Sequence, residues 1–208
     1  DLKRKFYLKE ISSIIKEKYY NSNLILRGNI YNSSKNNHEE KDIFCKIIPI
    51  LDPMQIINNN YNLVNKNNYH LPSNYNFNTF SKINDIDNTA YIDVFCSYLF
   101  SLLTVNDILP SFAIFYGSIN GIGEYKYDIT DEYDELRLDK CFNKNIGKSF
   151  DVDMFVSSSD EESESESDYN IGSDDYVVKF NKIPLQLLFI EKLEGTLEDY
   201  LLDDNFKE

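Results

Sequence analysis

Apolar residues near the start of the chain recur with a loose helical period. Residues 6–20 read FYLKEISSIIKEKYY, in which lysines and glutamates separate the apolar positions. The apolar positions with this spacing are Phe6, Ile11, Ile14, Ile15 and Tyr19. Such spacing is typical of one face of an amphipathic helix. The pattern predicts a helical N-terminal extension within residues 1–22.

Two runs rich in β-branched residues follow. Residues 24–31 read LILRGNIY, and residues 43–51 read IFCKIIPIL. The stretch between them, residues 32–42, is polar and contains Ser, Asn and charged residues. Short apolar runs bounded by polar clusters are typical of strands, so the sequence predicts two neighbouring antiparallel strands.

One segment in the middle of the chain has a strong helical period. Residues 52–88 precede it and are rich in Asn, Tyr, Ser and Pro, which predicts a long loop or insertion. From Thr89 the sequence reads TAYIDVFCSYLFSLL. Its apolar positions at spacings of three and four are Ile92, Phe95, Cys96, Leu99, Leu102 and Leu103. This pattern predicts a helix with one broad apolar face, and Pro110 breaks any continuation.

The second half of the chain contains two further predicted strands. Residues 112–119 read FAIFYGSI, whose aromatic and β-branched content favours a strand. Residues 183–190 read IPLQLLFI, a nearly continuous apolar run that is typical of a strand buried on both faces. A polar connection follows at residues 191–195. Thr196 as N-cap, with Asp199 in the first turn, then predicts a short helix.

Between these strands, residues 120–183 form a second predicted insertion with an acidic block. The formal charge of the chain is −14, and residues 151–175 hold ten Asp or Glu and no Lys or Arg, which leaves about −4 for the rest. At the centre of this acidic block, residues 160–168 hold six acids and offer no apolar side chain to bury, so we expect disorder over residues 151–175. No basic stripe remains to neutralise phosphates, so we expect no nucleic acid partner.

Serines in the acidic block allow two interpretations. Five of them have an acidic residue three positions later, which is the spacing that acid-directed kinases prefer: Ser157, Ser158, Ser159, Ser163 and Ser165. Phosphorylation there would increase the negative charge of the block. The alternative is a solvated, disordered insertion without a partner, which the composition alone favours.

Cysteines and histidines form no recognisable disulfide or metal pattern. Cys45, Cys96 and Cys141 are far apart and odd in number, which indicates a reducing compartment. His38 and His70 lie in Asn-rich polar stretches without a second ligand at metal spacing, so we expect no metal site. No window approaches 18 consecutive apolar residues, and no apolar segment follows the charged N-terminus. We therefore expect neither membrane association nor secretion.

The order of the elements, with one lysine, resembles a protein-kinase small lobe. Phe44-Cys45-Lys46-Ile47 stands where kinases carry V-A-I-K, and LFIEKLEGTLEDYL at residues 188–201 resembles the end of strand five, the hinge and the following helix. Three blocks resemble the kinase-like serine/threonine family of giant nucleocytoplasmic large DNA viruses. They read YIDVFCSYLFSLL, ILPSFAIFYGSINGIGEYKYDI and QLLFIEKLEGTLED.

This resemblance implies an α+β fold of the protein-kinase N-lobe type. It would have an antiparallel β-sheet, one αC-type helix and long disordered or irregular insertions. The lobe and hinge would span residues 23–201, with insertions at residues 52–88 and 120–183. Residues 202–208 would then begin a missing C-lobe.

The resemblance also assigns residues that would bind ATP. Lys46 would hold the α and β phosphates, and Asp93 would be the helix acid that orients it. Kinases use Glu at that position, and because Asp is one methylene shorter, the pair would need a closer helix or a bridging water. The alternative is a lysine with its head in water and a solvated aspartate.

At the hinge, backbone groups would hold the adenine. The resemblance makes Ile190 the gatekeeper, and it assigns the carbonyl of Glu191 and both backbone groups of Leu193 to the base. Gly195 would let the chain turn past the ligand.

The sequence departs from the kinase pattern in two ways. Gly28 is the only glycine before Gly117, so the glycine-rich loop between strands one and two is missing. The catalytic-loop H-R-D-x-x-x-x-N and the D-F-G metal ligand have no counterpart in the 208 residues. The chain alone should therefore be inactive, and Mg²⁺ would bind only through a missing C-lobe.

Three hypotheses about function remain open. The first is the ATP-binding lobe of a viral serine/threonine protein kinase that acts on a protein substrate. The second is a catalytically inactive, pseudokinase-like module that binds a protein partner, and the third is a virion component. We expect the host cytoplasm, in a viral factory, or the virion as its location. The sequence predicts no particular substrate or oligomeric state.

Overall fold

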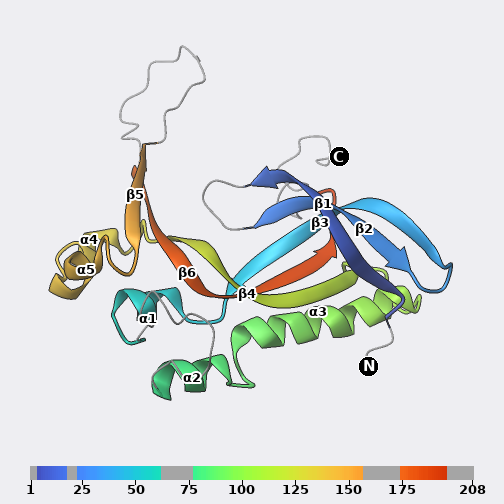
Figure 1. The fold of residues 1–208 in the computed structure, drawn as a ribbon, viewed down its shortest axis with the longest axis horizontal. Coiled ribbons are helices and arrows are strands. Elements are labelled where there is room, and N and C mark those ends of the chain that lie inside the picture. The colour runs from blue at the N-terminus through green and yellow to red at the C-terminus, as the bar shows by residue number, and fades with distance from the viewer. Residues whose placement is uncertain (1–3, 18–22, 62–76, 157–173, 196–208) are drawn as a thin grey trace, which may run out of the picture.

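The chain folds around one curled antiparallel sheet (Figure 1). The computed structural model describes residues 4–17, 23–61, 77–156 and 174–195. Within these residues the strands are β1 (Phe6–Glu17), β2 (Leu24–Asn32), β3 (Asn37–Pro49), β4 (Phe115–Asp128), β5 (Asp151–Val156) and β6 (Asp174–Glu191). Their order is β1-β2-β3-β6-β4, and β5 pairs with β6 beside this path. The helices together with this antiparallel sheet confirm the α+β class.

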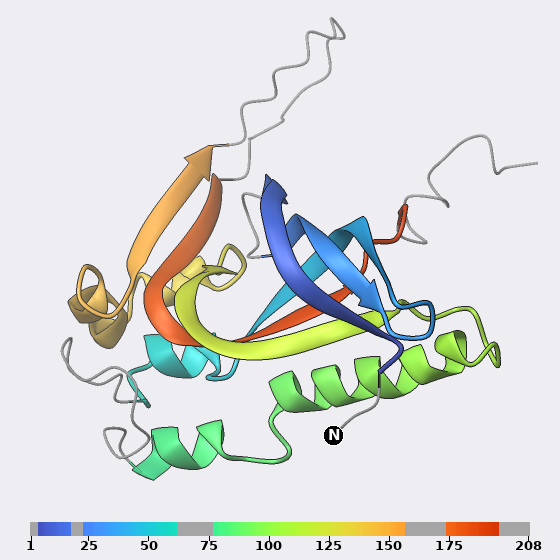
Figure 2. The same cartoon turned by 45° about the vertical axis from the view of Figure 1, so that its right-hand side comes forward.

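Three of the described helices lie along one side of the curled sheet, and the last two lie beside β5 at its end (Figure 1, Figure 2). In chain order, these helices are α1 (Pro53–Ile57), α2 (Phe77–Ile83), α3 (Thr89–Val105), α4 (Tyr133–Leu136) and α5 (Lys140–Asn145). The predicted helix from Thr89 is confirmed as α3, which packs along β4 and β6. Its N-cap Asn88 accepts a hydrogen bond from the N–H of Ala90 and donates to the carbonyls of Ile50 and Lys82. This buried asparagine therefore caps α3 and fastens its start to the chain just after β3.

β6 pairs with three other strands. Its last residues lie between β3 and β4, where Leu188 pairs with Lys46 on one side and with Ser118 on the other. Its first residues pair with β4 and β5. The predicted strand at residues 183–190 is confirmed as part of β6, and six of these eight residues are buried.

Two apolar clusters form the core. The first lies at β2, β3 and the adjoining ends of β4 and β6, and its buried members are Leu26, Ile30, Ile43, Cys45, Tyr116 and Phe189. The second lies at the other end of the sheet, and its members are Leu51, Ile56, Ile57, Ile129, Leu136, Phe142, Phe150, Val178, Phe180, Ile183 and Leu185. β6 contributes to both clusters, so it links the two parts of the core.

The two strands predicted early in the chain are confirmed as β2 and β3, which pair antiparallel. The polar stretch between them is mostly strand, because the pairing continues as far as Asn32 and Asn37. Only residues 33–36 form the turn, and Asn36 has a φ of 50°. Asparagine tolerates this left-handed backbone better than most residues, which allows such a tight connection.

The helix predicted near the N-terminus is wrong, because residues 6–17 form β1. β1 pairs with β2 with three register shifts, between Leu8 and Glu10, between Ile11 and Ser13, and between Ile14 and Lys16. Each shift adds a residue to β1, so its apolar positions lose the period of two that identifies a strand. The remaining spacings of three and four imitate a helix.

Both predicted insertions contain ordered elements. Residues 52–88 include α1 and α2, and residues 62–76 lie outside the described part of the chain. β4 starts at Phe115, later than predicted, and continues to Asp128 within the second insertion. The disorder predicted over residues 151–175 is wrong for residues 151–156, which form β5, and for residues 174–175, which begin β6. Hydrogen bonding to β6 orders this acidic strand despite its charges.

Gly28 lies where β1 and β2 approach closely, and its replacement should destabilise the protein. A Cβ atom there would lie 2.7 Å from the carbonyl oxygen of Glu10 and 2.9 Å from Cδ1 of Ile43. Because the oxygen belongs to the backbone, it cannot rotate away, so Gly28→Ala should lower the free energy of unfolding by about 1–3 kcal/mol in urea denaturation. Gly121→Ala is the control, because its nearest atom, Cδ1 of Leu187, would lie at 3.8 Å. Equal losses in both variants would contradict the packing argument.

The three thiols should differ in reactivity. Cys45 is fully buried in β3, and burial raises the pKa of its thiol to about 12. Cys96 and Cys141 are partly exposed. Since the thiolate is the reactive form, two thiols should react with Ellman's reagent in the native protein, and the third only after unfolding. Rapid reaction of all three in the native state would show that the first core cluster opens readily.

Candidate functional site

Lys46 of β3 and Asp93 of α3 form an ion pair across the face of the sheet. The Nζ atom of Lys46 lies 2.5 Å from Oδ2 of Asp93 and donates a hydrogen bond to it. The two side chains are 44% and 31% exposed, so the pair is accessible to solvent. The contact is direct, and neither a bridging water nor a longer glutamate is required to make it.

The alternation of side chains along β3 places Lys46 towards α3. Ile43 and Cys45 are fully buried in the first core cluster. Successive side chains of a strand point to opposite faces, so Phe44 and Lys46 project from the other face. α3 packs on β4 and β6, and it reaches Lys46 from that side with Asp93.

The predicted hinge residues follow directly from β6. Ile190 is the register partner of Phe44, and both residues are partly buried. Paired residues of an antiparallel sheet project to the same face, so Ile190 shares the face of Lys46. Ile190, the predicted gatekeeper, therefore lies beside Phe44, which is two residues from Lys46 along β3.

Glu191 and Leu193 differ in their surroundings. The N–H of Glu191 donates to the carbonyl of Ile114 at 2.8 Å, and its carboxylate accepts a hydrogen bond from the N–H of Ile114 at 3.2 Å. This double contact holds the end of β6 against the chain just before β4. The side chain of Leu193 is 58% exposed. Thr196 and Asp199, the predicted start of a helix, lie outside the described residues.

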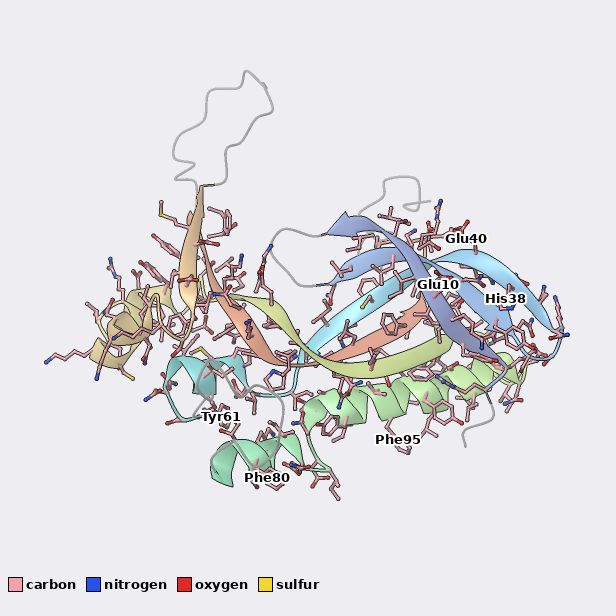
Figure 3. All side chains as sticks on the ribbon, viewed as in Figure 1. Glu10, His38, Glu40, Tyr61, Phe80 and Phe95 are labelled. Carbon is pink, nitrogen blue, oxygen red and sulfur yellow. The ribbon has the colours of Figure 1, made fainter. Side chains whose placement is uncertain are left out.

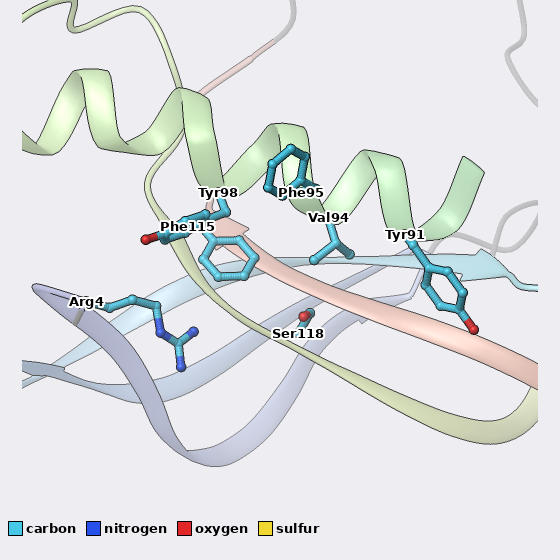
Figure 4. Close-up of a pocket in the computed structure, with 7 residues that line it drawn as sticks. All are labelled: Arg4, Tyr91, Val94, Phe95, Tyr98, Phe115 and Ser118. Atoms are coloured by element: carbon cyan, nitrogen blue, oxygen red, sulfur yellow. The ribbon is translucent and has the colours of Figure 1, made fainter. Parts of the chain in front are cut away.

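A pocket that the sequence did not predict lies between α3 and β4 (Figure 4). It has a volume of about 440 Å³, and its lining residues are Arg4, Tyr91, Val94, Phe95, Tyr98, Phe115 and Ser118. A second hollow, of about 590 Å³, lies between β1 and β4 and also has Arg4 in its lining. The sequence gives little sign of either, because each combines residues about a hundred positions apart.

Other predicted positions lie apart from this region. His38 lies on the β2–β3 hairpin, away from Phe95 on α3 (Figure 3). The Nδ1 atom of His38 lies 3.1 Å from Oδ1 of Asn29. In the described ranges, no three His, Cys, Asp or Glu residues gather as a metal site requires. His70 and the serines Ser157, Ser158, Ser159, Ser163 and Ser165 are outside those ranges.

No helix in the described part of the chain has the length and apolar character needed to cross a bilayer. Comparison of the chain with protein-family models, with curated proteins and with solved structures found no match.

The ion pair should contribute little to stability, since both of its members are partly exposed. A double-mutant cycle with Lys46→Met and Asp93→Asn should give a coupling free energy below about 1 kcal/mol in urea denaturation. The pair formed by Lys82 and Asp85, whose atoms are 3.9 Å apart, is a reference that should give a value near zero. A coupling well above about 2 kcal/mol at Lys46 would indicate a structural pair instead of an available ligand group.

Proposed function

We propose that this chain is the nucleotide-binding lobe of a protein-kinase-like protein. The observation that carries the proposal is the ion pair between Lys46, on the third strand, and Asp93, on the helix that follows. Protein kinases use a lysine on the third strand and an acid on the next helix in this way. The order of elements also agrees, since β4 and β6 follow α3 and lead to a polar connection.

Lys46 is suited to bind phosphate groups. Its ammonium is held by Asp93, and 44% of the side chain is exposed, so phosphate oxygens can approach it. An ammonium that is already oriented loses less side-chain entropy when it binds. ATP would supply the phosphoryl group, with Lys46 contacting its phosphates and the backbone near Ile190, Glu191 and Leu193 contacting the base. The catalytic aspartate that accepts the substrate proton and the Mg²⁺ ligands for phosphoryl transfer would have to come from residues outside these 208.

A second candidate function is a protein-interaction module that no longer uses ATP. Two observations favour it. Residues 18–23, which connect β1 and β2, contain no glycine. When Lys46 is aligned with the lysine of V-A-I-K, Phe44 takes the place of the alanine, so a phenyl ring stands beside Ile190 where the motif has a methyl group. This bulk would reduce the space for a base under β3.

Nucleotide binding by the variant Lys46→Met separates these two functions. A fluorescent ATP analogue with Mg²⁺ should bind to the wild-type chain, and Lys46→Met should weaken that binding about tenfold or more. A hydrogen bond from a charged group to phosphate contributes about 1.5–3 kcal/mol, which gives this factor. Lys41→Met is the control, since Lys41 pairs with Glu39 on the exposed hairpin.

If the wild-type chain does not bind the analogue, or if the wild-type chain and Lys46→Met bind it equally, the proposal of a nucleotide-binding lobe is ruled out. The protein-interaction module is then the better account. If instead the wild-type chain binds the analogue and Lys46→Met binds it weakly, the same variants in the full natural reading frame would be assayed for phosphoryl transfer. Transfer that is lost in Lys46→Met but kept in Lys41→Met would establish the kinase activity.

A further inference from the structure

α3 leaves apolar side chains uncovered. Ile92, Phe95 and Leu99 are 43%, 59% and 42% exposed. Their spacing of three and four places them on one stripe of the helix. A helix that is apolar on most sides is normally covered by other elements, and a contiguous exposed apolar surface is typical of an interaction site.

The pocket between α3 and β4 lies beside this stripe, and Phe95 belongs to both (Figure 4). Its aromatic residues are held by their neighbours. The ring of Tyr98 meets the ring of Phe115 edge-on, with centroids 5.7 Å apart, and the hydroxyl of Tyr91 donates to the carbonyl of Ile83 at 2.6 Å. A preformed pocket of about 440 Å³ is large enough for one aromatic side chain with its adjoining backbone.

Arg4 gives the pocket a positive charge. Its guanidinium lies 5.6 Å from the ring centroid of Phe115, and Nη1 donates to the carbonyl of Tyr116 at 3.3 Å. The hydroxyl of Ser33 donates to the backbone carbonyl of Arg4, which fixes the chain at this point. The side chain is therefore already directed towards the pocket.

Arg4 has no carboxylate partner among the described residues. The chain has three arginines, and the other two pair with acids of their own, Arg27 with Asp42 and Arg137 with Asp134. Arginine binds a carboxylate through two parallel hydrogen bonds, and several of its donors are left for a ligand.

We propose that this pocket binds a short acidic segment of a partner protein that inserts one aromatic side chain. The aromatic side chain packs against Phe95, Tyr98 and Phe115, and a neighbouring carboxylate pairs with Arg4. A segment with both features complements the charge and the lining of the pocket together. This proposal uses none of the residues assigned to ATP, because neither Lys46 nor Asp93 lines the pocket.

The acidity of the chain does not oppose such a ligand at this place. Ten of the acidic residues belong to residues 151–175. β5 and the start of β6, which flank that block, lie at the opposite end of the sheet from the N-terminal end of β1 (Figure 1). Salt at physiological concentration screens exposed charges that are far apart, so acidic residues at that end of the sheet act only weakly on a ligand at Arg4.

A tryptophan-containing peptide tests the proposal, because the chain itself has no tryptophan. The probe is an acetylated, amidated peptide with one tryptophan between glutamates, and its fluorescence anisotropy reports binding directly. Saturable binding is expected, and Arg4→Gln should weaken it about tenfold or more, since hydrogen bonds between charged groups are lost. A second probe has glutamines in place of the glutamates. It should bind the wild-type chain more weakly than the acidic probe does, and it should bind the wild-type chain and Arg4→Gln with the same affinity.

Matched variants distinguish the pocket from general effects. Lys5→Gln removes the neighbouring positive charge, which lies over the ring of Phe6 and does not line the pocket. Phe95→Ser and Ile92→Ser each remove one exposed apolar side chain from the stripe on α3, but only Phe95 lines the pocket. Arg4→Gln and Phe95→Ser should weaken binding, while Lys5→Gln and Ile92→Ser should not.

Either of two results would overturn the proposal. Absence of saturable binding to the wild-type chain, or equal weakening by Arg4→Gln and Lys5→Gln, would exclude an acidic peptide as the occupant. Circular dichroism of each variant checks that it is folded. Arg4→Lys provides a second variant, which keeps the charge without the planar fork and should show an intermediate affinity.

Discussion

The position of β6 is the constraint on which the rest of the structure depends. It lies between β3 and β4 at one end and between β4 and β5 at the other. Val178 and Phe180 belong to one core cluster and Phe189 to the other. Since both clusters share this strand, neither can form fully before β6 has paired with strands far from it in sequence. Such non-local pairing makes folding slow but the product cooperative.

The candidate site is a consequence of this pairing. β6 fixes the register of β3, and the register decides which side chains face the core. Cys45 is buried, and therefore Lys46 projects from the outer face. Asn88 fastens the start of α3 close to the end of β3, which brings Asp93 within reach of that lysine. The ion pair is thus determined by the buried side of the sheet more than by its own attraction.

The sequence predicted the elements whose periodicity is regular and failed where it is not. α3, β2 and β3 have regular spacing or continuous apolar runs, so their type was clear. β1 was not recognised because its three register shifts break the alternation of side chains. The second insertion looked unstructured, yet Phe142 and Phe150 from it are buried in the core. Isolated aromatic residues in a polar segment give no period from which burial could be predicted.

The two candidate sites differ in how far the sequence could predict them. Lys46 and Asp93 were predicted as a pair, because the resemblance to a kinase small lobe assigns a lysine on the third strand and an acid on the following helix. The pocket was not predicted, because Arg4 reaches the residues of α3 and β4 only through the contact between β1 and β4, which the sequence does not indicate. Of its aromatic lining residues, the sequence placed Phe95 on an apolar helix face and Phe115 in a predicted strand, and it gave Tyr91 and Tyr98 no role.

α3 carries one part of each site, and this limits how independently they can be arranged. Asp93 contacts Lys46, while Tyr91 and Val94, its near neighbours in the same turn, line the pocket. A helix turn moves as a rigid unit because its backbone hydrogen bonds are all internal. The distance of α3 from the sheet therefore determines both the width of the pocket and the contact between Lys46 and Asp93. The packing that keeps Asp93 in contact with Lys46 therefore also keeps the pocket at its width.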